Sequence, residues 1–485
     1  MQLSLISWCL RINFEHQIFI MDRRKFLKGS AMLSGLLTIN PLDLFAGNTK
    51  IIPLDSKKAK NIIFMVSDGM SLGTLSMADL YSRNILGKTS HWMNLYHTGK
   101  VSRALMDTAS ASSIVTDSAA ASSAFGGGVR VKNGVLNVGA NGERYVPIWQ
   151  KFKKAGKKAG CVTTVTITHA TPAGFCINSD SRNAEPEIAE MYLEQELDVM
   201  MGGGDEFFNP EKRTDRKDVY NSYKQKEYQV LKTKADLTNA KKNGKVLGVF
   251  SSGALPYTVD RNSLADLQGS PTLAEMAGAA IEQMKDHAEG FVLQVEGGKV
   301  DWAAHANDIS ALIHDQLAFD EAVKTVLDFA EKDGETLVII TTDHGNANPG
   351  TIYGPDATSK FNSISNYKYS NEYVLNSIKS DFNLQQIKDW IYETNKIRLS
   401  DEEGKHLLDF YLGLEKHESG LYNYKKLPYK AFSDMQQKHN NVGWISMDHS
   451  GDYVEVAAFG PGKELLPSFV KNTDLHQLLL KASKI

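Results

Sequence analysis

Three short apolar segments, each ending close to an acidic residue, constrain the fold of this chain more than any other feature. Residues 61–66 run into Asp68, residues 291–295 into Glu296, and residues 336–342 into Asp343. Their length and aliphatic composition predict buried β-strands. A helix predicted over residues 309–333 separates the last two segments, and alternation of strands with helices favours a mostly parallel sheet. The sequence therefore predicts an α/β fold.

Other segments extend this alternation. Strands are predicted over 161–167 and 452–459, a short apolar run covers 197–201, and helices are predicted over 118–124 and 148–159. Residues 207–244 are charged and weakly periodic, which indicates a peripheral helix and loops. Residues 351–437 are polar and rich in tyrosine and lysine, and they lie between two clusters of candidate metal ligands. We interpret residues 351–437 as an insertion near the active site.

Seven carboxylate and imidazole side chains at or near the predicted strand ends form a candidate metal site. They are Asp68, Glu296, Asp301, His305, Asp343, His344 and His449. Oxygen and imidazole nitrogen suit Zn²⁺, and seven groups are too many for one tetrahedral ion. Open α/β sheets place active sites at the carboxyl ends of their strands. Each residue alone has a structural interpretation as a turn or helix-surface group, but together they indicate a multi-metal hydrolase.

A second motif begins an alanine-rich helix at Ser118. A serine in this position is commonly only a helix cap. The same position offers backbone N–H groups and the positive end of a helix dipole, which stabilise an alkoxide or a phosphate. The chain has no Gly-x-Ser-x-Gly motif around this serine, so metal coordination is the alternative means of activating it. The local sequence leaves both interpretations open.

A third motif combines His169, Thr171 and Arg182. Thr171-Pro172 predicts a helix start, and Thr171 alone could be a cap. Arg182 alone could be a surface cation, although a guanidinium matches two phosphate oxygens at once.

Composition excludes some functions and leaves a question about the cysteines. The chain has 485 residues, 23% charged residues and a net charge of −3, so nucleic-acid binding is not expected. The length fits one large domain with insertions, or two domains. Of the three cysteines, Cys161 and Cys176 lie outside the N-terminal segment. A disulfide between them is one interpretation, and two buried thiols is the favoured one.

The N-terminus has the pattern of an export signal. Arg23-Arg24 precedes the apolar stretch 31–39 and small residues at 46–47. We therefore predict a twin-arginine signal over 1–46, a catalytic domain over 55–485, and a periplasmic or secreted protein. The apolar stretch is too short for a stable membrane anchor.

The motifs together resemble the bacterial alkaline phosphatase family in order and spacing. They are Ser67-Asp68-Gly69-Met70, Thr116-Asp117-Ser118-Ala119-Ala120, His169-Ala170-Thr171-Pro172, Arg182, Val295-Glu296-Gly297-Gly298 with Asp301 and His305, Thr342-Asp343-His344 and His449-Ser450-Gly451. The resemblance implies a three-layer α/β/α fold with the sheet between helices. It also implies hydrolysis of phosphate monoesters through a phosphoserine on Ser118, with inorganic phosphate as an inhibiting product, and a homodimer is a family-level expectation.

The resemblance further implies two Zn²⁺ ions and one Mg²⁺. The first zinc would be held by Asp301, His305 and His449, the second by Asp68, Asp343 and His344, and the magnesium by Asp68, Thr171 and Glu296. Arg182 would bind the phosphoryl group. His169, Trp302 and Asn346 stand at positions where family members vary, and His169 could contact the third metal directly. The alternatives are a phosphodiesterase or sulfatase of the same superfamily, or a noncatalytic metal- or phosphate-binding protein.

Overall fold

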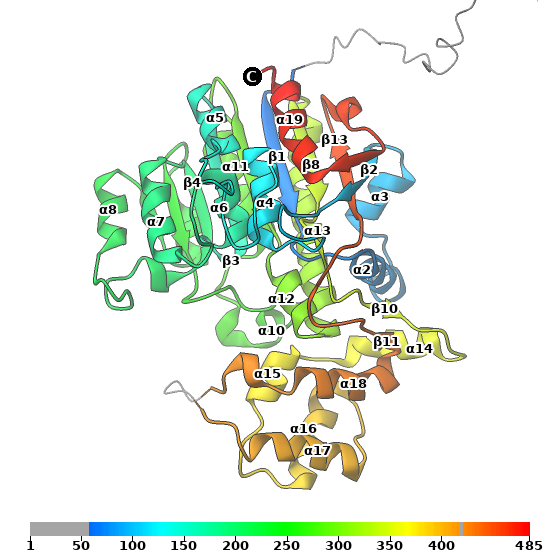
Figure 1. Ribbon diagram of the computed structural model, residues 1–485. Coiled ribbons are helices and arrows are strands. Elements are labelled where there is room, and N and C mark those ends of the chain that lie inside the picture. The colour runs from blue at the N-terminus through cyan, green and yellow to red at the C-terminus, as the bar shows by residue number, and fades with distance from the viewer. Residues whose placement is uncertain (1–57, 417–420) are drawn as a thin grey trace, which may run out of the picture. The chain divides into compact units, whose positions relative to one another are not determined.

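A ten-stranded sheet, ordered β14-β2-β13-β8-β1-β7-β3-β4-β6-β5, forms the centre of the computed structural model, which describes residues 58–416 and 421–485 (Figure 1). Its strands are β1 (Asn61–Val66), β2 (Ser102–Asp107), β3 (Lys158–Thr166), β4 (Val199–Gly203), β5 (Gln229–Leu231), β6 (Val246–Val249), β7 (Phe291–Glu296), β8 (Thr336–Thr341), β13 (Val454–Phe459) and β14 (Phe469–Lys471). Within this sheet β13 runs antiparallel to both of its neighbours, β8 and β2, and the other pairings are parallel. The predicted mostly parallel sheet is confirmed, and the predicted signal over 1–46 lies outside the described residues.

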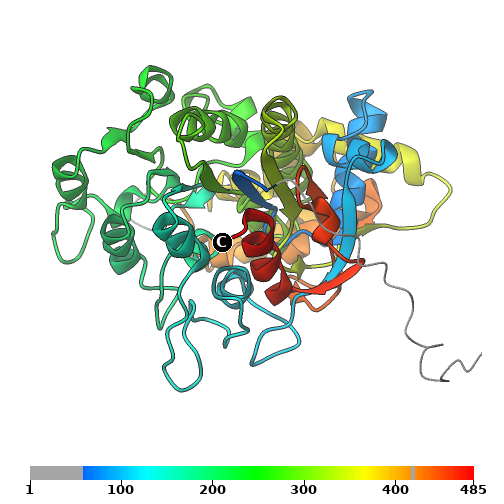
Figure 2. The same cartoon turned by 90° about the horizontal axis from the view of Figure 1, so that it is seen from above.

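Helices cover both faces of the sheet, which confirms the three-layer α/β/α fold (Figure 2). One layer contains α2 (Leu72–Ile85), α3 (His91–His97), α10 (Thr258–Ser263), α11 (Leu273–Met284), α12 (Lys299–His305) and α13 (Ile309–Asp333). The other contains α4 (Ser118–Gly127), α5 (Ile148–Lys154), α6 (Ala170–Cys176), α7 (Glu185–Glu194), α8 (Val219–Gln225) and α19 (Asn472–Ser483). Strand β1 divides its side chains between the layers: Ile63 and Met65 pack against the first, and Ile62 and Phe64 against the second.

A group of five helices lies beyond the carboxyl ends of the parallel strands (Figure 1). These are α14 (Ala357–Asn362), α15 (Asn371–Asn376), α16 (Leu384–Asn395), α17 (Asp401–Tyr411) and α18 (Tyr429–Asn440). Their buried apolar side chains, which include Ile391 and Phe432, belong to the same cluster as the first helical layer. This helical group covers most of the polar segment 351–437.

The structure corrects the predicted helix over 148–159. Helix α5 ends at Lys154, because Gly156 adopts a left-handed backbone (φ 86°) and Lys158 already begins β3. The segment 207–244 contributes the short edge strand β5 as well as helices, which its charged composition did not indicate. Cys161 and Cys176 are both buried free thiols, so the favoured interpretation is confirmed. No helix among the described residues is long and apolar enough to cross a membrane.

Helices α4 and α6 touch through their backbones at Gly126 and Gly174. A Cβ atom built on Gly126 would lie 1.9 Å from the Gly174 carbonyl oxygen, and one on Gly174 would lie 2.2 Å from Ser122 Oγ. Because α4 begins at Ser118 and α6 contains Thr171, this contact sets the distance between two parts of the candidate site.

Gly126→Ala is expected to destabilise the protein, although alanine is intrinsically the better helix residue. The new methyl group must push α4 and α6 apart, at a cost of about 1–3 kcal/mol in the free energy of unfolding. The matched control is Gly278→Ala in α11, whose Cβ would meet only Thr325 Cγ2 at 3.5 Å. That control should be neutral or gain up to about 1 kcal/mol. Urea unfolding of the three proteins measures the difference, and equal stabilities for both variants would contradict the packing argument.

Candidate active site

The register of the central strands brings three candidate ligands to one edge of the sheet. Val66 of β1 is aligned with Glu296 of β7 and with Thr341 of β8. Asp68 and Asp343 follow those strands by two residues. Both aspartates and Glu296 are fully buried. The predicted meeting of strand-end acids therefore occurs in the interior, between the sheet and its helices.

Asp68, Asp343 and His344 form the first candidate metal group. One ligand atom of each lies within 4.8 Å of the others. His344 Nε2 is 3.5 Å from Asp68 Oδ1 and 3.4 Å from Asp343 Oδ2. His344 Nδ1 lies 3.2 Å from the Gly345 carbonyl oxygen, a contact that leaves Nε2 directed at the two carboxylates. These are the three residues that the family resemblance assigns to the second zinc.

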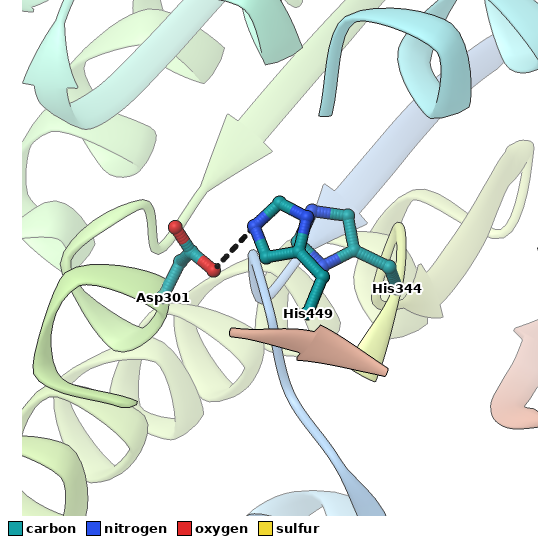
Figure 3. Close-up of side chains that lie close together, drawn as sticks. All are labelled: Asp301, His344 and His449. Carbon is teal, nitrogen blue, oxygen red and sulfur yellow. Dashed lines mark ion pairs between the residues drawn. The ribbon is translucent and has the colours of Figure 1, made fainter. Parts of the chain in front are cut away.

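Asp301, His344 and His449 form a second group, in which Asp301 Oδ1 is 3.5 Å from His449 Nε2 (Figure 3). The rings of His344 and His449 stack with centroids 3.8 Å apart. His305, predicted beside Asp301 and His449, places Nε2 at 3.3 Å from Asp301 Oδ2. Its Nδ1 donates to the Met447 carbonyl oxygen at 2.6 Å, and His449 Nδ1 donates to a backbone carbonyl oxygen at 2.9 Å. Both imidazoles therefore direct Nε2 to the same carboxylate.

The third group contains Asp68, Glu296 and His169. His169 Nδ1 is 3.6 Å from Glu296 Oε1 and 4.0 Å from Asp68 Oδ2. Thr171, at the start of α6, donates its hydroxyl to Asp68 Oδ2 at 3.2 Å. The imidazole therefore takes part directly in the third group, in addition to the predicted acids and threonine.

Buried ligand atoms without partners indicate that divalent cations fit this site. Asp68 Oδ1, Asp343 Oδ2, both Glu296 carboxylate oxygens and His169 Nδ1 have no hydrogen-bond partner among the described residues. No lysine or arginine of the described chain forms an ion pair with these carboxylates. Burying unpaired charges costs several kcal/mol each, so such a cluster requires cations. Carboxylate and imidazole are suitable ligands for Zn²⁺, and carboxylate and hydroxyl for Mg²⁺.

The pKa values of the acids and imidazoles in the site reflect the close approach of these buried carboxylates. Burial and the neighbouring carboxylates raise the pKa of Asp68 well above its ordinary value. Burial and the charge of Asp301 raise the pKa of Asp343 to about 6. Burial acts in the same direction on Asp301, but His305 and His449 outweigh it and hold the Asp301 pKa well below the ordinary value. Burial and the neighbouring His449 lower the pKa of His344, which keeps that imidazole neutral and able to bind a metal.

Ser118 and Arg182 face this cluster in one cavity of about 860 Å³. Ser118 is the first residue of α4, and its Oγ is 3.2 Å from His344 Nε2. Asp117 caps the helix by accepting a hydrogen bond from Ala120 N at 2.9 Å. Arg182 Nη1 pairs with Asp117 Oδ2 at 3.1 Å, and Nη2 lies 3.1 Å from His169 Nε2. The nucleophile candidate and the cation therefore meet at the same helix end.

Two residues of the site were not assigned a role from the sequence. Asp117 orients Arg182 through their ion pair. Its position before a serine and three alanines indicates only a helix cap. Asn346 donates from Nδ2 to Asp301 Oδ1 at 2.7 Å and to the Asp301 carbonyl oxygen at 3.2 Å. No local pattern reveals that contact, because the two residues come from distant elements.

Comparison with known proteins agrees with this geometry. A profile of the alkaline phosphatase family matches residues 59–485. The chain belongs to the alkaline phosphatase family. It is 31% identical over 440 residues to alkaline phosphatase 4 of Bacillus subtilis (strain 168), and the aligned region covers 89% of this chain and 90% of that protein. It is 30% identical over 346 residues to the alkaline phosphatase of Escherichia coli (strain K12), which covers 62% and 73%.

The fold supports the same conclusion. The crystal structure of Thermus thermophilus alkaline phosphatase matches with a TM-score of 0.80 and 32% identity, over 88% of this chain and 91% of that one. The predicted family and enzyme class are confirmed: the chain is an alkaline phosphatase, a metal-dependent hydrolase of phosphate monoesters.

Asp343→Asn is expected to change how stability depends on pH once divalent cations are chelated. The folded-state pKa of Asp343, about 6, exceeds the ordinary value of 3.8. Its neutral carboxyl group therefore favours folding below about pH 4, and this contribution is lost as the pH rises through 6. Between pH 4.5 and 7.5, wild type should lose roughly 1–3 kcal/mol of unfolding free energy relative to Asp343→Asn.

Urea unfolding in a chelator at both pH values tests this expectation. Asp286→Asn, which removes an exposed carboxylate, provides the control and should follow wild type. The same pH dependence in all three proteins would contradict the effect of the crowded acids.

Proposed function

We propose that this alkaline phosphatase transfers the phosphoryl group to Ser118 and then to water. The observation that carries the proposal is the position of Ser118 Oγ, 3.2 Å from His344 Nε2 at the start of α4 and in the same cavity as Arg182. The backbone N–H groups and dipole of α4 favour an oxyanion there.

We also propose the metal assignment that the family resemblance implies. Asp301, His305 and His449 would hold one zinc, and Asp68, Asp343 and His344 the other. The magnesium would be held by Asp68, Thr171 and Glu296, with His169 beside it. When bound, these cations supply Lewis-acid stabilisation of the charges that develop on the entering and leaving oxygens. Asn346 would orient Asp301 for the first zinc through its 2.7 Å hydrogen bond.

The proposed reaction consists of two successive displacements at phosphorus. In the first, Ser118 loses its hydroxyl proton, Oγ bonds to phosphorus, the ester P–O bond breaks, and the alcohol leaves with a proton. In the second, a water oxygen bonds to phosphorus, the Ser118 Oγ–P bond breaks, and inorganic phosphate is released as Oγ regains a proton. Arg182, held by Asp117 and His169, neutralises the nonreacting phosphoryl oxygens in both steps. Inorganic phosphate should inhibit because it occupies the same position.

The first prediction concerns the nucleophile. Ser118→Ala should retain its metals but form no phosphoenzyme, and its kcat for a p-nitrophenyl phosphate monoester should fall by about three decades or more. Ser365→Ala, which removes an exposed hydroxyl between α14 and α15, is the control. Acid quenching with labelled phosphate locates the phosphorylated residue. Label on any residue other than Ser118 would refute the assignment.

The second prediction concerns Arg182. Arg182→Ala removes charge-assisted hydrogen bonds of about 1.5–3 kcal/mol each, so kcat/KM for a monoester should fall by roughly two to four decades. Phosphate inhibition should weaken as well. A diester presents less charge to the guanidinium, so its turnover should fall much less. Arg144→Ala, which breaks an exposed ion pair with Asp180, should leave all three quantities unchanged.

The monoester and diester kinetics distinguish a phosphoryl contact from damage to the site. Equal losses for both esters would mean that the variant disturbs the metal cluster. A p-nitrophenyl sulfate assay in parallel tests the sulfatase alternative. Faster turnover of the diester or the sulfate by wild type would replace the monoesterase proposal.

We further propose that the protein is exported by the twin-arginine route and acts as a periplasmic or secreted enzyme, with a homodimer as its expected assembly. The motif Arg23-Arg24 before a short apolar stretch supports the export proposal. Replacing both arginines with lysine should leave the precursor in the cytoplasm, as measured by cell fractionation. Normal export of the double variant would refute the route without affecting the enzymatic proposal.

A further inference from the structure

The wall of the cavity that faces Ser118 contains aromatic and charged side chains with no role in the proposed reaction. Tyr257 precedes α10, Trp302 lies in α12, and Glu372 and Tyr429 belong to the five-helix group. All four line the same 860 Å³ cavity as Ser118. This is the size of a site for a small organic ligand, far larger than a phosphate needs. The cavity therefore has room for the alcohol part of the substrate.

Two buried acids fix the position of Glu372. Asp260 Oδ1 accepts from Ser370 N at 2.7 Å, and Asp260 Oδ2 accepts from Ser370 Oγ at 2.6 Å. Asp308 accepts from Asn371 N, the next residue. Both acids belong to the sheet-and-helix part of the chain and are buried. These hydrogen bonds hold the first turn of α15 next to the cavity, and Glu372 is part of that turn.

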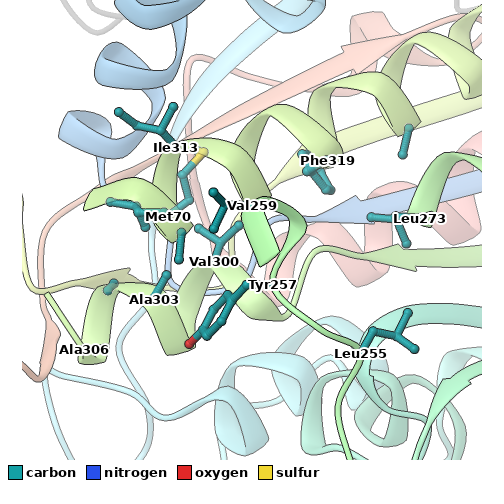
Figure 4. Packing of buried hydrophobic residues seen from close by; sticks show 14 of the residues in the cluster. Met70, Leu255, Tyr257, Val259, Leu273, Val300, Ala303, Ala306, Ile313 and Phe319 are labelled. Carbon is teal, nitrogen blue, oxygen red and sulfur yellow. The ribbon is translucent and has the colours of Figure 1, made fainter. Parts of the chain in front are cut away.

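Three polar groups of this wall lack partners within the described residues. The Tyr257 hydroxyl, the Trp302 indole N–H and the Glu372 carboxylate make no hydrogen bond or ion pair there. Tyr257 is only 4% exposed, and its ring packs beside Val300 and Ala303 with the hydroxyl at the margin of the apolar cluster (Figure 4). A nearly buried hydroxyl that lines a cavity is suited to bind a ligand, because leaving it unpaired costs free energy.

The position of Lys299 indicates which kind of ligand ring would stack against this wall. Its Nζ lies 3.5 Å from the centroid of the Tyr257 ring and 4.7 Å from that of Trp302. Lys299 is 4% exposed, so it stands behind the cavity wall. Lys299 already occupies a cation position against these two rings, and the charge of Glu372 acts on it. A ring polarised by a cation prefers to stack on an electron-rich heteroaromatic ring.

We propose that Tyr257, Trp302 and Glu372 form a subsite for a planar heteroaromatic group on the leaving alcohol, so that nucleoside monophosphates are preferred substrates. This proposal rests on the proposed monoesterase function, because the phosphoryl group must lie at Ser118. The Trp302 indole would stack on the base, and the Tyr257 hydroxyl and Glu372 carboxylate would bind polar groups on the edge of the base.

Adenosine 5′-monophosphate and ribose 5-phosphate test the subsite, because they share the ribose and the primary leaving oxygen and differ at C1, which carries adenine in one and a hydroxyl group in the other. The purified enzyme with its metals should show kcat/KM about 5- to 150-fold higher for the nucleotide. Glu372→Gln and Tyr257→Phe should each reduce that ratio by about 3- to 10-fold, and Trp302→Ala should bring it near one. Ribose 5-phosphate turnover should change by less than about threefold in Glu372→Gln and Tyr257→Phe.

Glu393→Gln is the matched control, since Glu393 is an exposed acid of the same helical group. It should leave both esters unchanged. A wild-type ratio near one, or equal losses for both esters in Glu372→Gln and Tyr257→Phe, would overturn the subsite.

Binding of adenosine, which has no phosphate, separates the two proposals. Saturation-transfer NMR should detect adenosine on wild type and a weaker signal on Glu372→Gln. If adenosine binding depends on Glu372 but the protein hydrolyses neither ester, the proposed function is refuted and the subsite is supported. Hydrolysis of both esters at equal rates without adenosine binding would refute the subsite alone.

Discussion

Electrostatic repulsion among four buried carboxylates is the constraint around which this structure is built. Asp68, Glu296, Asp301 and Asp343 lie at adjoining ends of β1, β7 and β8 and at the start of α12. Only imidazoles of the described chain come within ion-pair distance of them. The apolar burial of the sheet must therefore support an unfavourable charge cluster, and bound cations reverse the sign of that contribution. The free energy of unfolding and the affinity for metals are therefore thermodynamically linked.

The sequence predicted the central part of the fold and singled out most of the acids and imidazoles that the structure brings together. Parallel strands buried on both faces, such as β1 and β8, are continuous apolar runs, so their ends are visible where a polar residue interrupts them. The long helix α13 was visible because its apolar positions repeat over 25 residues. Edge strand β5 was missed, since half of its environment is solvent and its composition is that of a loop.

Contacts between distant segments explain the remaining omissions. Asn346 reaches Asp301, and Asp308 reaches Asn371, across separations of 45 and 63 residues. Neither contact leaves a periodic signal in the sequence. The role of the polar segment 351–437 was open for the same reason. Its composition indicated an insertion near the active site, but only the tertiary structure shows that Glu372 and Tyr429 share a cavity with Ser118.

The direction of β13 has a consequence for biosynthesis. A parallel strand delivers a side chain to the active edge after it, as β1 does with Asp68, whereas an antiparallel strand must deliver one before it. His449 accordingly precedes β13, and β13 lies between β8 and β2 in the sheet. A nascent chain therefore carries Ser118 331 residues before His449, and His344 105 residues before it. Until β13 leaves the ribosome, β2 has no neighbour through which to join the sheet, and the group that contains His449 is the last of the three to be completed.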